Sequence, residues 1–529
     1  MDASVEDLFR RLERLNDIGA SLSKERHLPR LLEKILLAAK NITGADGGTL
    51  YRMSEDKRHL HFEIVRNDTL KIAFGGTSGQ PISDKFQDLP LYKEDGERNN
   101  SMVAAYAALT GETVHIADAY VAEGFDFSGT CRFDQNTGYH SQSFLTVPMK
   151  NHEGEIIGVL QLINALNAEG KVTAFSMADQ RLAESLASQA AIALTNHQLI
   201  VQMEELFEAF IKLINLAIDE KSPYTGGHCQ RVPELTMLLA EAVNATEEGP
   251  LAGFKLSDKD RYELKIAALL HDCGKVTTPV HVVDKATKLH TLFDRIHLLD
   301  IRFEVLKRDA EIDMWRAIAE GVPPPLAEEN LHKRLQQIDD DRNFLRQTNI
   351  GGERMSDEAI ARVQRIGSQY RWINPTGQEV SFLSDEELEN LSIRAGTLTA
   401  KEREIINYHI VATIKMLEQL PWPKHLKNVP EYAGGHHERM DGKGYPRGLT
   451  REQMSLQARM MGIADIFEAL TAKDRPYKEA MKLSQALSIM ENFKNGGHID
   501  PDLYEVFVKG EVFRKYAERF LAPEQNDWK

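Results

Sequence analysis

The sequence predicts a multidomain protein in which an α+β domain is followed by a nearly all-helical domain with a helical insertion. Three observations predict this class. The chain has 529 residues, its apolar residues change from strand spacing to helix spacing along the chain, and a highly charged segment interrupts its second half. This length exceeds that of a typical domain with a single hydrophobic core. We therefore expect an N-terminal helix over 1–27, an α+β domain over 28–176, a linking helix over 177–221 and a helical domain over 222–529.

The first 165 residues combine helix and strand patterns. Apolar residues at steps of three and four predict helical structure over residues 3–40. The segment "HLHFEIV" at 59–65 alternates Leu60, Phe62 and Ile64 with polar neighbours, as a strand does. The segment "SFLTVPMKNHEGEIIGVLQLINA" at 143–165 predicts two strands around an Asn-His-Glu-Gly turn. These patterns indicate an α+β domain.

The linking helix is predicted to run without interruption from Met177 to Glu220 and to stop at Pro223. Its apolar stripe consists of Leu182, Leu186, Ala193, Ile200, Met203, Phe207, Phe210, Ile214 and Ala217. The later steps alternate three and four, and this 3.5-residue period suits a seam between two paired helices. We therefore expect a homodimer. The alternative is a single helix packed on its own domain.

The helical domain is interrupted by a charged segment over 289–394 that contains a "VPPP" break at 322–325. Capping boxes are predicted at Ser384 to Glu387 and at Thr399 to Glu402. We interpret 289–394 as a helical insertion, with a disordered linker as the alternative. A helical apolar stripe, which a disordered linker would not need, favours the insertion and consists of Ile296, Leu299, Phe303 and Leu306.

Charge and cysteine content exclude several classes of protein. The formal net charge of −16 argues against a binder of nucleic acid polymers, which need an excess of cations. The start "MDASVEDLFRR" lacks the pattern of a signal peptide, and no apolar run is long enough to cross a membrane. We therefore expect a cytoplasmic protein. Cys131, Cys229 and Cys273 form no CxxC pair, so they are interpreted as reduced thiols.

The residues typical of metal chemistry flank the insertion. In "AALLHDCGK", His271 and Asp272 stand side by side at the end of an apolar helix. Imidazole donates nitrogen to one ion, while a carboxylate can bridge a pair of ions. Further histidines and an aspartate follow in the segments "YTGGHCQRV", "EREIINYHIVATIKML", "AGGHHERMDGKGYPRGL" and "ADIFEALTAKDRPYK".

In this order, "HDCGK", "HHERMDGKGYPRGL" and "ADIFEALTAKDRPYK" resemble the HD-GYP family, a branch of the HD metal-dependent phosphohydrolase superfamily, over about 222–288 and 394–520. The resemblance implies an all-helical domain that hydrolyses cyclic di-GMP to pGpG, and further to GMP, in bacterial second-messenger signalling. It also implies two divalent transition-metal ions, iron or manganese. The implied ligands are His228, His271, Asp272, His409, His436, His437 and Asp465.

The same resemblance implies a role for each remaining site residue. Asp272 bridges the ions and Lys275 neutralises phosphate oxygens, so these two are the expected catalytic residues. Lys275, Tyr445, Arg475 and Lys478 are the expected substrate contacts. Members with a third metal carry a Glu about one helical turn before the first His. This chain has Tyr224 there, with Asp219 and Glu220 further back, which argues against a third ion.

The N-terminal domain resembles a GAF domain over roughly 28–200. The segment "FDQNTGYHSQSFLTVPM" is similar to the one that lines the pocket of cyclic-nucleotide-type GAF domains. In the usual downstream motif, this chain keeps Asn164, Phe175 and Asp179 but lacks the Lys and the Glu. The resemblance implies a regulatory domain with a small-molecule ligand. A purely dimerising domain is the alternative.

Two classes of function follow from these resemblances. The first is a signalling phosphodiesterase for cyclic di-GMP that is regulated by its GAF domain, with cyclic GMP-AMP as a rival substrate. The second is a slow or inactive module that binds a cyclic dinucleotide or docks a signalling protein. Retention of His271, Asp272, Lys275 and the other implied ligands favours the enzyme.

Overall fold

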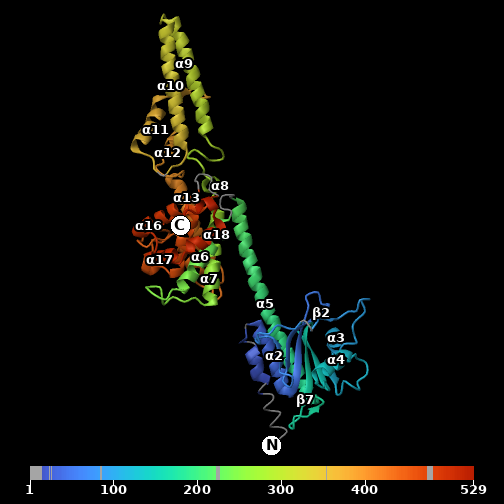
Figure 1. The fold of residues 1–529 in the computed structure, drawn as a ribbon. Helices are drawn as coiled ribbons and strands as arrows, with labels where there is room; N and C mark the ends of the chain where they lie inside the picture. The colour runs from blue at the N-terminus through green and yellow to red at the C-terminus, as the bar shows by residue number, and fades with distance from the viewer. Residues whose placement is uncertain are drawn as a thin grey trace. The chain divides into compact units, whose positions relative to one another are not determined.

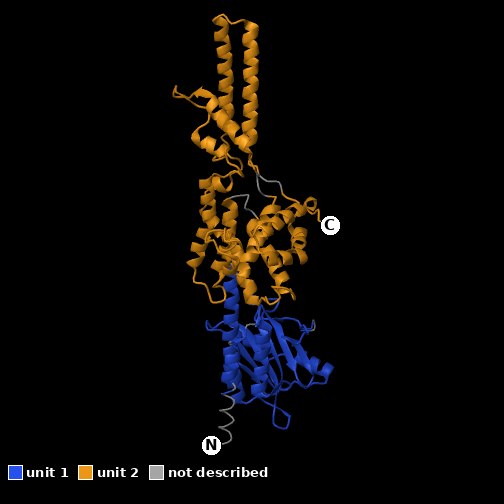
Figure 2. Ribbon diagram, turned by 90° about the vertical axis from the view of Figure 1, so that its left-hand side faces the viewer, with its two compact units in different colours: residues 1–207 blue, residues 208–529 orange. Residues whose placement is uncertain are grey.

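The computed structural model describes residues 13, 15–22, 24–25, 27–83, 86–221, 227–352, 354–473 and 480–528. Contacts divide the chain into two compact units, 1–207 and 208–529 (Figure 2). Unit 1 is α+β, and the described part of unit 2 is helical apart from one small hairpin (Figure 1). The predicted fold class is thereby confirmed. The predicted boundary at 221/222 stays a prediction, since residues 222–226 lie outside the described ranges.

Unit 1 is built on an antiparallel sheet with the strand order β3-β2-β1-β7-β6-β5, to which β4 and β8 add short pairs. Its strands are β1 (Ala45–Met53), β2 (His59–Asn67), β3 (Ile72–Gly75), β4 (Leu89–Pro90), β5 (Val114–Ile116), β6 (Phe144–Lys150), β7 (Ile156–Leu166) and β8 (Val172–Thr173). One face packs on α2 (Leu28–Thr43) and the start of α5 (Met177–Lys221). The other packs on α3 (Val103–Thr110) and α4 (Ser128–Thr137). The unit is therefore a three-layer sandwich with one core on each face of the sheet.

The strand predicted at 59–65 is present as β2, but its apolar residues do not share one face. Phe62 pairs with Tyr51, whereas Ile64 pairs with Leu50, so Glu63 is an extra residue in the ladder. Such a bulge shifts the alternation by one residue. Leu60 and Phe62 consequently belong to the core under α3, whereas Ile64 belongs to the core under α2.

The hairpin predicted at 143–165 is confirmed. β6 and β7 pair directly, and the turn between them is closed by the Asn151 N–H donating to the Glu155 carbonyl at 2.9 Å. Gly154 supplies the left-handed conformation that this turn requires, with φ of 80°. The helix predicted over 3–40 is not continuous. Residues 15–22 are helical, Glu25 and His27 are not, and α2 begins at Leu28.

Asn164 fixes the loop that precedes β6. It adopts a left-handed conformation with φ of 57°. Its side-chain oxygen accepts the N–H groups of Gln142 at 2.8 Å and Ser143 at 3.1 Å, and its amide donates to the His140 carbonyl at 2.8 Å. This residue of the incomplete GAF motif thus has a structural use that does not require the missing Lys and Glu.

The linking helix α5 is a single helix of 45 residues, from Met177 to Lys221. Its first part belongs to unit 1, where Leu182, Leu186 and Ala193 are buried in the core. These three residues of the predicted seam are therefore unavailable to a partner helix. From Ile200 onward the stripe is largely exposed. Ile200 is 58% exposed, Met203 70% and Phe210 56%.

The charged segment of unit 2 is folded within the described residues, and its status as an insertion stays a prediction. It contains the helices α9 (Ile296–Ala319), α10 (Pro324–Asn349), α11 (Asp357–Gln369) and α12 (Asp385–Leu391) and the small hairpin of β9 (Arg371–Ile373) and β10 (Glu379–Ser381). α9 and α10 lie side by side (Figure 1). The predicted stripe is buried, and both predicted capping boxes are present. The hairpin was not predicted, because each of its strands has only three residues.

The remaining elements of unit 2 form the helical body that carries the implied ligands. They are α6 (His228–Asn244), α7 (Asp258–Leu270), η1 (Cys273–Thr277), α8 (Val280–Val283), α13 (Ala400–Glu418), α14 (Val429–Gly434), η2 (Arg451–Gln453), α15 (Leu456–Thr471), α16 (Leu483–Asn495), α17 (Pro501–Lys509), α18 (Val512–Phe520) and η3 (Pro523–Gln525). α6 packs on α7 and α15, and α13 packs on η1 and α14. Within the described residues, no helix is both long enough and apolar enough to cross a membrane.

A buried lysine at the base of the insertion gives a prediction about stability and pH. Lys288 is 3% exposed, and burial lowers its pKa from 10.5 to about 8. Its ammonium contacts the Leu391 carbonyl at 3.2 Å and the Met355 sulfur at 3.3 Å. Because the unfolded chain binds this proton more tightly, the free energy of unfolding should rise as pH increases from about 8 toward 10.5. The rise is at most about 1.4 kcal/mol per pH unit.

Urea unfolding at pH 7.5 and at pH 9.5 tests this expectation. Lys288→Met should remove the increase in the free energy of unfolding that Lys288 causes between these two pH values. Lys285→Met should keep this increase. Lys285 is the matched control because its buried ammonium is paired with Glu402 at 2.7 Å. An equal pH dependence in the wild type and in Lys288→Met would contradict the expectation.

Candidate metal centre

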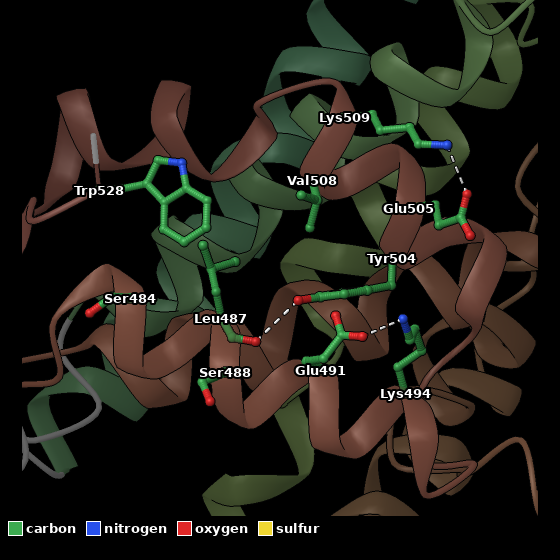
Figure 3. Close-up of a pocket in the computed structure, with 10 residues that line it drawn as sticks. All are labelled: Ser484, Leu487, Ser488, Glu491, Lys494, Tyr504, Glu505, Val508, Lys509 and Trp528. Carbon is green, nitrogen blue, oxygen red and sulfur yellow. Dashed lines mark hydrogen bonds and ion pairs between the residues drawn. The ribbon is translucent and has the colours of Figure 1, made fainter.

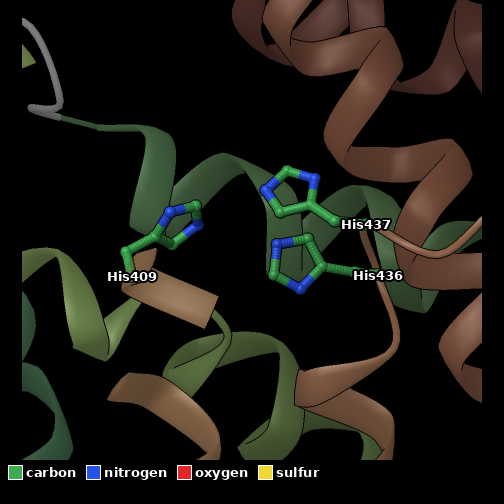
Figure 4. A group of neighbouring side chains, drawn as sticks. All are labelled: His409, His436 and His437. Carbon is green, nitrogen blue, oxygen red and sulfur yellow. The ribbon is translucent and has the colours of Figure 1, made fainter. Parts of the chain in front are cut away.

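Two groups of histidine and aspartate side chains lie together in the helical body. His228, His271 and Asp272 form one group, and His409, His436 and His437 form the other (Figure 4). Within each group, one ligand atom per residue lies within 4.8 Å of the others. Nitrogen and carboxylate donors at such spacing suit a transition-metal ion.

Three of the histidines are held by the same local bond. In His271 and His436, the Nδ1–H donates to the carbonyl three residues earlier, in both cases at 2.7 Å. His409 bonds the Ile406 carbonyl in the same way. A carbonyl can only accept, so Nδ1 carries the proton and the Nε2 lone pair is free. For His271 and His436 the accepting carbonyl lies in the last turn of α7 or α14, and for His409 it lies in the middle of α13. In all three the bond fixes the tautomer that binds a metal.

His228 is held differently, by a carboxylate from another helix. Its Nδ1 lies 2.6 Å from Glu468 Oε2, and Arg231 donates to the same carboxylate at 2.7 and 2.8 Å. Glu468 is fully buried. Neither Glu468 nor Arg231 was assigned a role from the sequence. Their helical spacing was an available signal, since each lies three residues from an implied ligand on the same helix.

Asp272 contacts histidines of both groups. Its Oδ2 lies 3.0 Å from His228 Nε2 and 3.2 Å from His271 Nε2, whereas its Oδ1 lies 3.2 Å from His409 Nε2. Asp465 extends the cluster, with an oxygen 3.3 Å from His228 Nε2 and another 4.0 Å from His437 Nδ1. All seven implied ligands therefore converge, and the assignment of each as a ligand stays a prediction.

Orphaned polar atoms show that the residues fit a metal. Asp272 Oδ1, His409 Nε2 and His436 Nε2 are buried and have no hydrogen-bond partner among the described residues. Leaving buried polar atoms unpaired is costly unless another group satisfies them. A divalent transition-metal ion satisfies nitrogen and carboxylate donors of this kind.

The pKa values of these residues keep the donors in binding-competent forms. Burial, followed by repulsion from His437 and His271, holds the pKa of His436 well below its usual value. Burial also lowers the pKa of His437 to about 4. Burial alone would raise the pKa of Asp272, but Lys275 and His271 outweigh it and hold that pKa well below the usual range. The two adjacent histidines are therefore neutral and the carboxylate is ionised at neutral pH.

A loop after His437 closes one side of the centre. The Tyr445 ring stacks on the His437 ring with centroids 4.9 Å apart. Glu438 braces the loop by accepting the N–H groups of Arg447 at 2.7 Å and Leu449 at 2.9 Å. Gly444 is required by close approach, because a Cβ there would lie 2.4 Å from the Arg439 nitrogen. Glu438 therefore holds the loop in place.

The expected substrate contacts are placed only in part. The Lys275 ammonium lies 2.6 Å from Asp272 Oδ2, and despite burial its pKa is raised by Asp272. It therefore keeps its positive charge beside the centre. Tyr445 stands at the loop, in contact with His437. Arg475 and Lys478 lie outside the described residues.

The two cysteines beside implied ligands are poor candidates for redox chemistry. Cys229 and Cys273 are 1% and 2% exposed. Burial raises the pKa of the Cys229 thiol to about 12 and that of the Cys273 thiol to about 11. Because the thiolate is the reactive form, both behave as small apolar side chains at neutral pH.

A separate groove of about 350 Å³ lies between α16, α17 and Trp528 (Figure 3). Its two cations are already paired, Lys494 with Glu491 at 2.5 Å and Lys509 with Glu505 at 3.0 Å. The groove is lined by none of the implied histidine ligands, so we do not place the metal centre there.

Family models place two kinds of domain on the chain. A GAF domain model matches residues 27–194, and two HD domain models match residues 225–340 and 382–503. The chain therefore contains a GAF domain followed by an HD domain. Among solved structures, the GAF domain of an Acinetobacter phosphoenolpyruvate-protein phosphotransferase aligns at 15% identity and a TM-score of 0.27, covering 36% of this chain and 98% of that one.

The chain is also similar to curated phosphodiesterases. It is 39% identical to 3'3'-cGAMP-specific phosphodiesterase 1 of Vibrio cholerae, covering 19% of this chain and 22% of that protein. It is 26% identical to 3'3'-cGAMP-specific phosphodiesterase 3 of the same organism, covering 57% and 38%. It is 47% identical to a cyclic di-GMP phosphodiesterase of Pseudomonas aeruginosa, covering 22% and 27%. The chain thus spans less than two fifths of the length of each of these relatives.

Proposed function

We propose that this protein is a metal-dependent phosphodiesterase that hydrolyses a cyclic dinucleotide and is regulated through its GAF domain. The observation that carries the proposal is the position of Asp272, whose two oxygens contact one histidine group each. A carboxylate in this position can bridge two ions. The similarity to HD-domain phosphodiesterases supports the same activity.

Each group of side chains would hold one ion, with Asp272 shared between them. When bound, two divalent transition-metal ions lower the pKa of a water molecule and polarise the phosphodiester. Lys275 keeps its proton because its ammonium pairs with Asp272, so it can neutralise a non-bridging phosphate oxygen. The Tyr445 loop would form a wall beside the substrate, and Arg475 and Lys478 remain predicted phosphate contacts.

Cyclic di-GMP is the proposed substrate, with pGpG as the product and GMP after a second cut. The rival is cyclic GMP-AMP, which two of the similar Vibrio cholerae proteins are named for. Incubation of manganese-loaded or iron-loaded full-length protein with each dinucleotide, followed by chromatography, decides between them. Faster turnover of cyclic GMP-AMP would identify it as the substrate in place of cyclic di-GMP. Tight binding without turnover of either would favour the slow or inactive binding module.

The number of ions is expected to be close to two per chain. Each described group supplies three ligand atoms for one ion, and Tyr224 stands where three-metal relatives are expected to have a Glu. Elemental analysis of protein purified without chelator measures the ratio of iron and manganese to chain. Three tightly held ions would contradict the expectation and would direct attention to Asp219, which has one buried oxygen without a partner among the described residues.

We further propose a homodimer that pairs through α5 beyond Ile200. In this part of the helix, the apolar residues Met203, Phe210 and Ile214 are 70%, 56% and 39% exposed. Their 3.5-residue spacing suits a partner helix in parallel orientation, and a second copy of the chain offers the same stripe in register.

Light scattering at micromolar concentration should therefore give the mass of a dimer. Met203→Glu combined with Phe210→Glu should give a monomer, because it places charges inside the seam. Lys212→Glu is the matched control, since Lys212 is exposed on the same helix outside the predicted stripe. A monomeric wild type, or a dimer that survives the double substitution, would rule out this interface.

A further inference from the structure

The last part of α5 packs on the segment that carries His271 and Asp272. Ile211, Asn215 and Ile218 are buried at 2%, 6% and 2% exposure and lie on one face of the helix. Glu208 begins this contact by pairing with Lys265 of α7 at 3.1 Å. All of these residues belong to unit 2. The helix that leaves the GAF domain therefore ends as part of the wall behind the metal centre.

Asn215 bonds the turn just before the ligands. Its Nδ2 donates to the Leu269 carbonyl at 3.0 Å, and its Oδ1 has no partner among the described residues. Leu269 lies in the last turn of α7, where helix carbonyls lack partners within the helix. The neighbouring carbonyl, of Ala268, accepts the Nδ1–H of His271. Asn215 thus fixes the same turn that orients His271.

Lys221 bonds the turn just after the ligands. Its ammonium donates to the Val276 carbonyl at 2.5 Å and reaches the Lys275 carbonyl at 3.4 Å. These carbonyls belong to η1, which starts directly after Asp272 and contains Lys275. A cation at the carbonyl end of a helix is favourable. Asn215 and Lys221 stand six residues apart, about 9 Å along α5, and hold the two sides of the His271–Asp272 pair.

We infer that Asn215 and Lys221 are positioning residues that set the placement of His271, Asp272 and Lys275 from the linking helix. This inference rests on the proposed function and adds to it the residues through which α5 acts. A shift or rotation of α5 would first displace the ligand group that contains Asp272. The group formed by His409, His436 and His437 lies on α13 and after α14, so it would be affected through Asp272 and through the packing of η1 on α13.

The test uses full-length protein, two substitutions and two controls. Asn215→Asp has nearly the same shape but cannot donate to the Leu269 carbonyl. Lys221→Met removes the ammonium at a partly exposed site, and Lys221→Arg restores a donor. Glu208→Gln is the matched control, because it removes the ion pair between α5 and α7 away from the turn. Each variant is stripped of metal and titrated with Mn²⁺ by calorimetry, and its thermal unfolding, kcat and KM are measured.

Asn215→Asp is expected to weaken Mn²⁺ binding about tenfold and to lower kcat with little change in KM, as loss of partners around metal ligands does. Lys221→Met should also weaken Mn²⁺ binding and lower kcat. Lys221→Arg and Glu208→Gln should have the Mn²⁺ affinity and kcat of the wild type. A purely structural role would lower the unfolding temperature and leave Mn²⁺ affinity unchanged. Unchanged affinity and kcat in Lys221→Met and in folded Asn215→Asp would overturn the inference. If Asn215→Asp does not fold, Lys221→Met decides alone.

Failure of the inference is separable from failure of the proposed function. If wild-type protein binds Mn²⁺ but hydrolyses no cyclic dinucleotide, the phosphodiesterase proposal is wrong, and the Mn²⁺ titrations still test the positioning role. If the wild type is active and the variants equal it in affinity and rate, the function stands and the positioning role is wrong.

Discussion

Asp272→Asn is expected to reduce turnover of the cyclic dinucleotide by about a thousandfold or more and to leave fewer than two ions per chain. The substitution preserves the shape of the side chain but removes its charge and one acceptor oxygen. The two oxygens of Asp272 reach His228 and His409, which belong to different ligand groups. Loss of a shared ligand costs several kcal/mol of transition-state stabilisation, and each 1.4 kcal/mol is about a factor of ten in rate.

Steady-state kinetics and elemental analysis of the same preparation measure both effects. The matched control is Asp258→Asn, at the exposed start of the helix that ends before His271, and it should retain metal and turnover. Circular dichroism should show the same helical content in both variants. An Asp272→Asn protein with wild-type rate and two ions would show that Asp272 is not shared between ions.

Gly274→Ala is expected to destabilise unit 2 and to abolish most turnover. A Cβ at this position would lie 2.0 Å from the His409 carbonyl oxygen and 2.5 Å from the Thr413 nitrogen. Both are backbone atoms of α13, so they cannot move aside as the end of a flexible side chain could. The η1 turn would have to separate from α13, which would carry Asp272 away from His409. Overpacking of this kind costs about 3 kcal/mol in the free energy of unfolding.

Urea unfolding, metal content and kcat together test this expectation. Gly253→Ala serves as the control, because the space around Gly253 is open and its backbone carries no strained φ. If Gly274→Ala folded with wild-type stability and retained two ions, the close approach of η1 and α13 would not be needed to bring Asp272 to His409.

Local features of the fold could be predicted because they depend on residues close together in the chain. The capping boxes at Ser384 and Thr399, the turn at Gly154 and the buried stripe of α9 all follow from spacing of two to four residues. The face reversal in β2 could not be predicted, since the bulge at Glu63 depends on how this strand pairs with β1. The loss of Leu182 and Leu186 from the predicted seam likewise depends on their packing in unit 1.

The sequence by itself determined the chemistry of the candidate centre: histidines, aspartates and a lysine in a recognisable order, with the side-chain donors that a transition metal needs. Only the tertiary structure decided which of them meet. His228 and Glu468 are 240 residues apart, and Asp272 and His409 are 137 apart in the chain numbering, yet both pairs are in contact. The contacts of Gly274 with α13 and of Asn215 with α7 have no pattern in the sequence. The spacing of Glu468 from Asp465 indicates a shared helix face but not the contact with His228. The reason is physical. The spacing of apolar residues and the capping of helices depend on residues within one or two helical turns of each other. Contacts between helices depend on which apolar faces pack together.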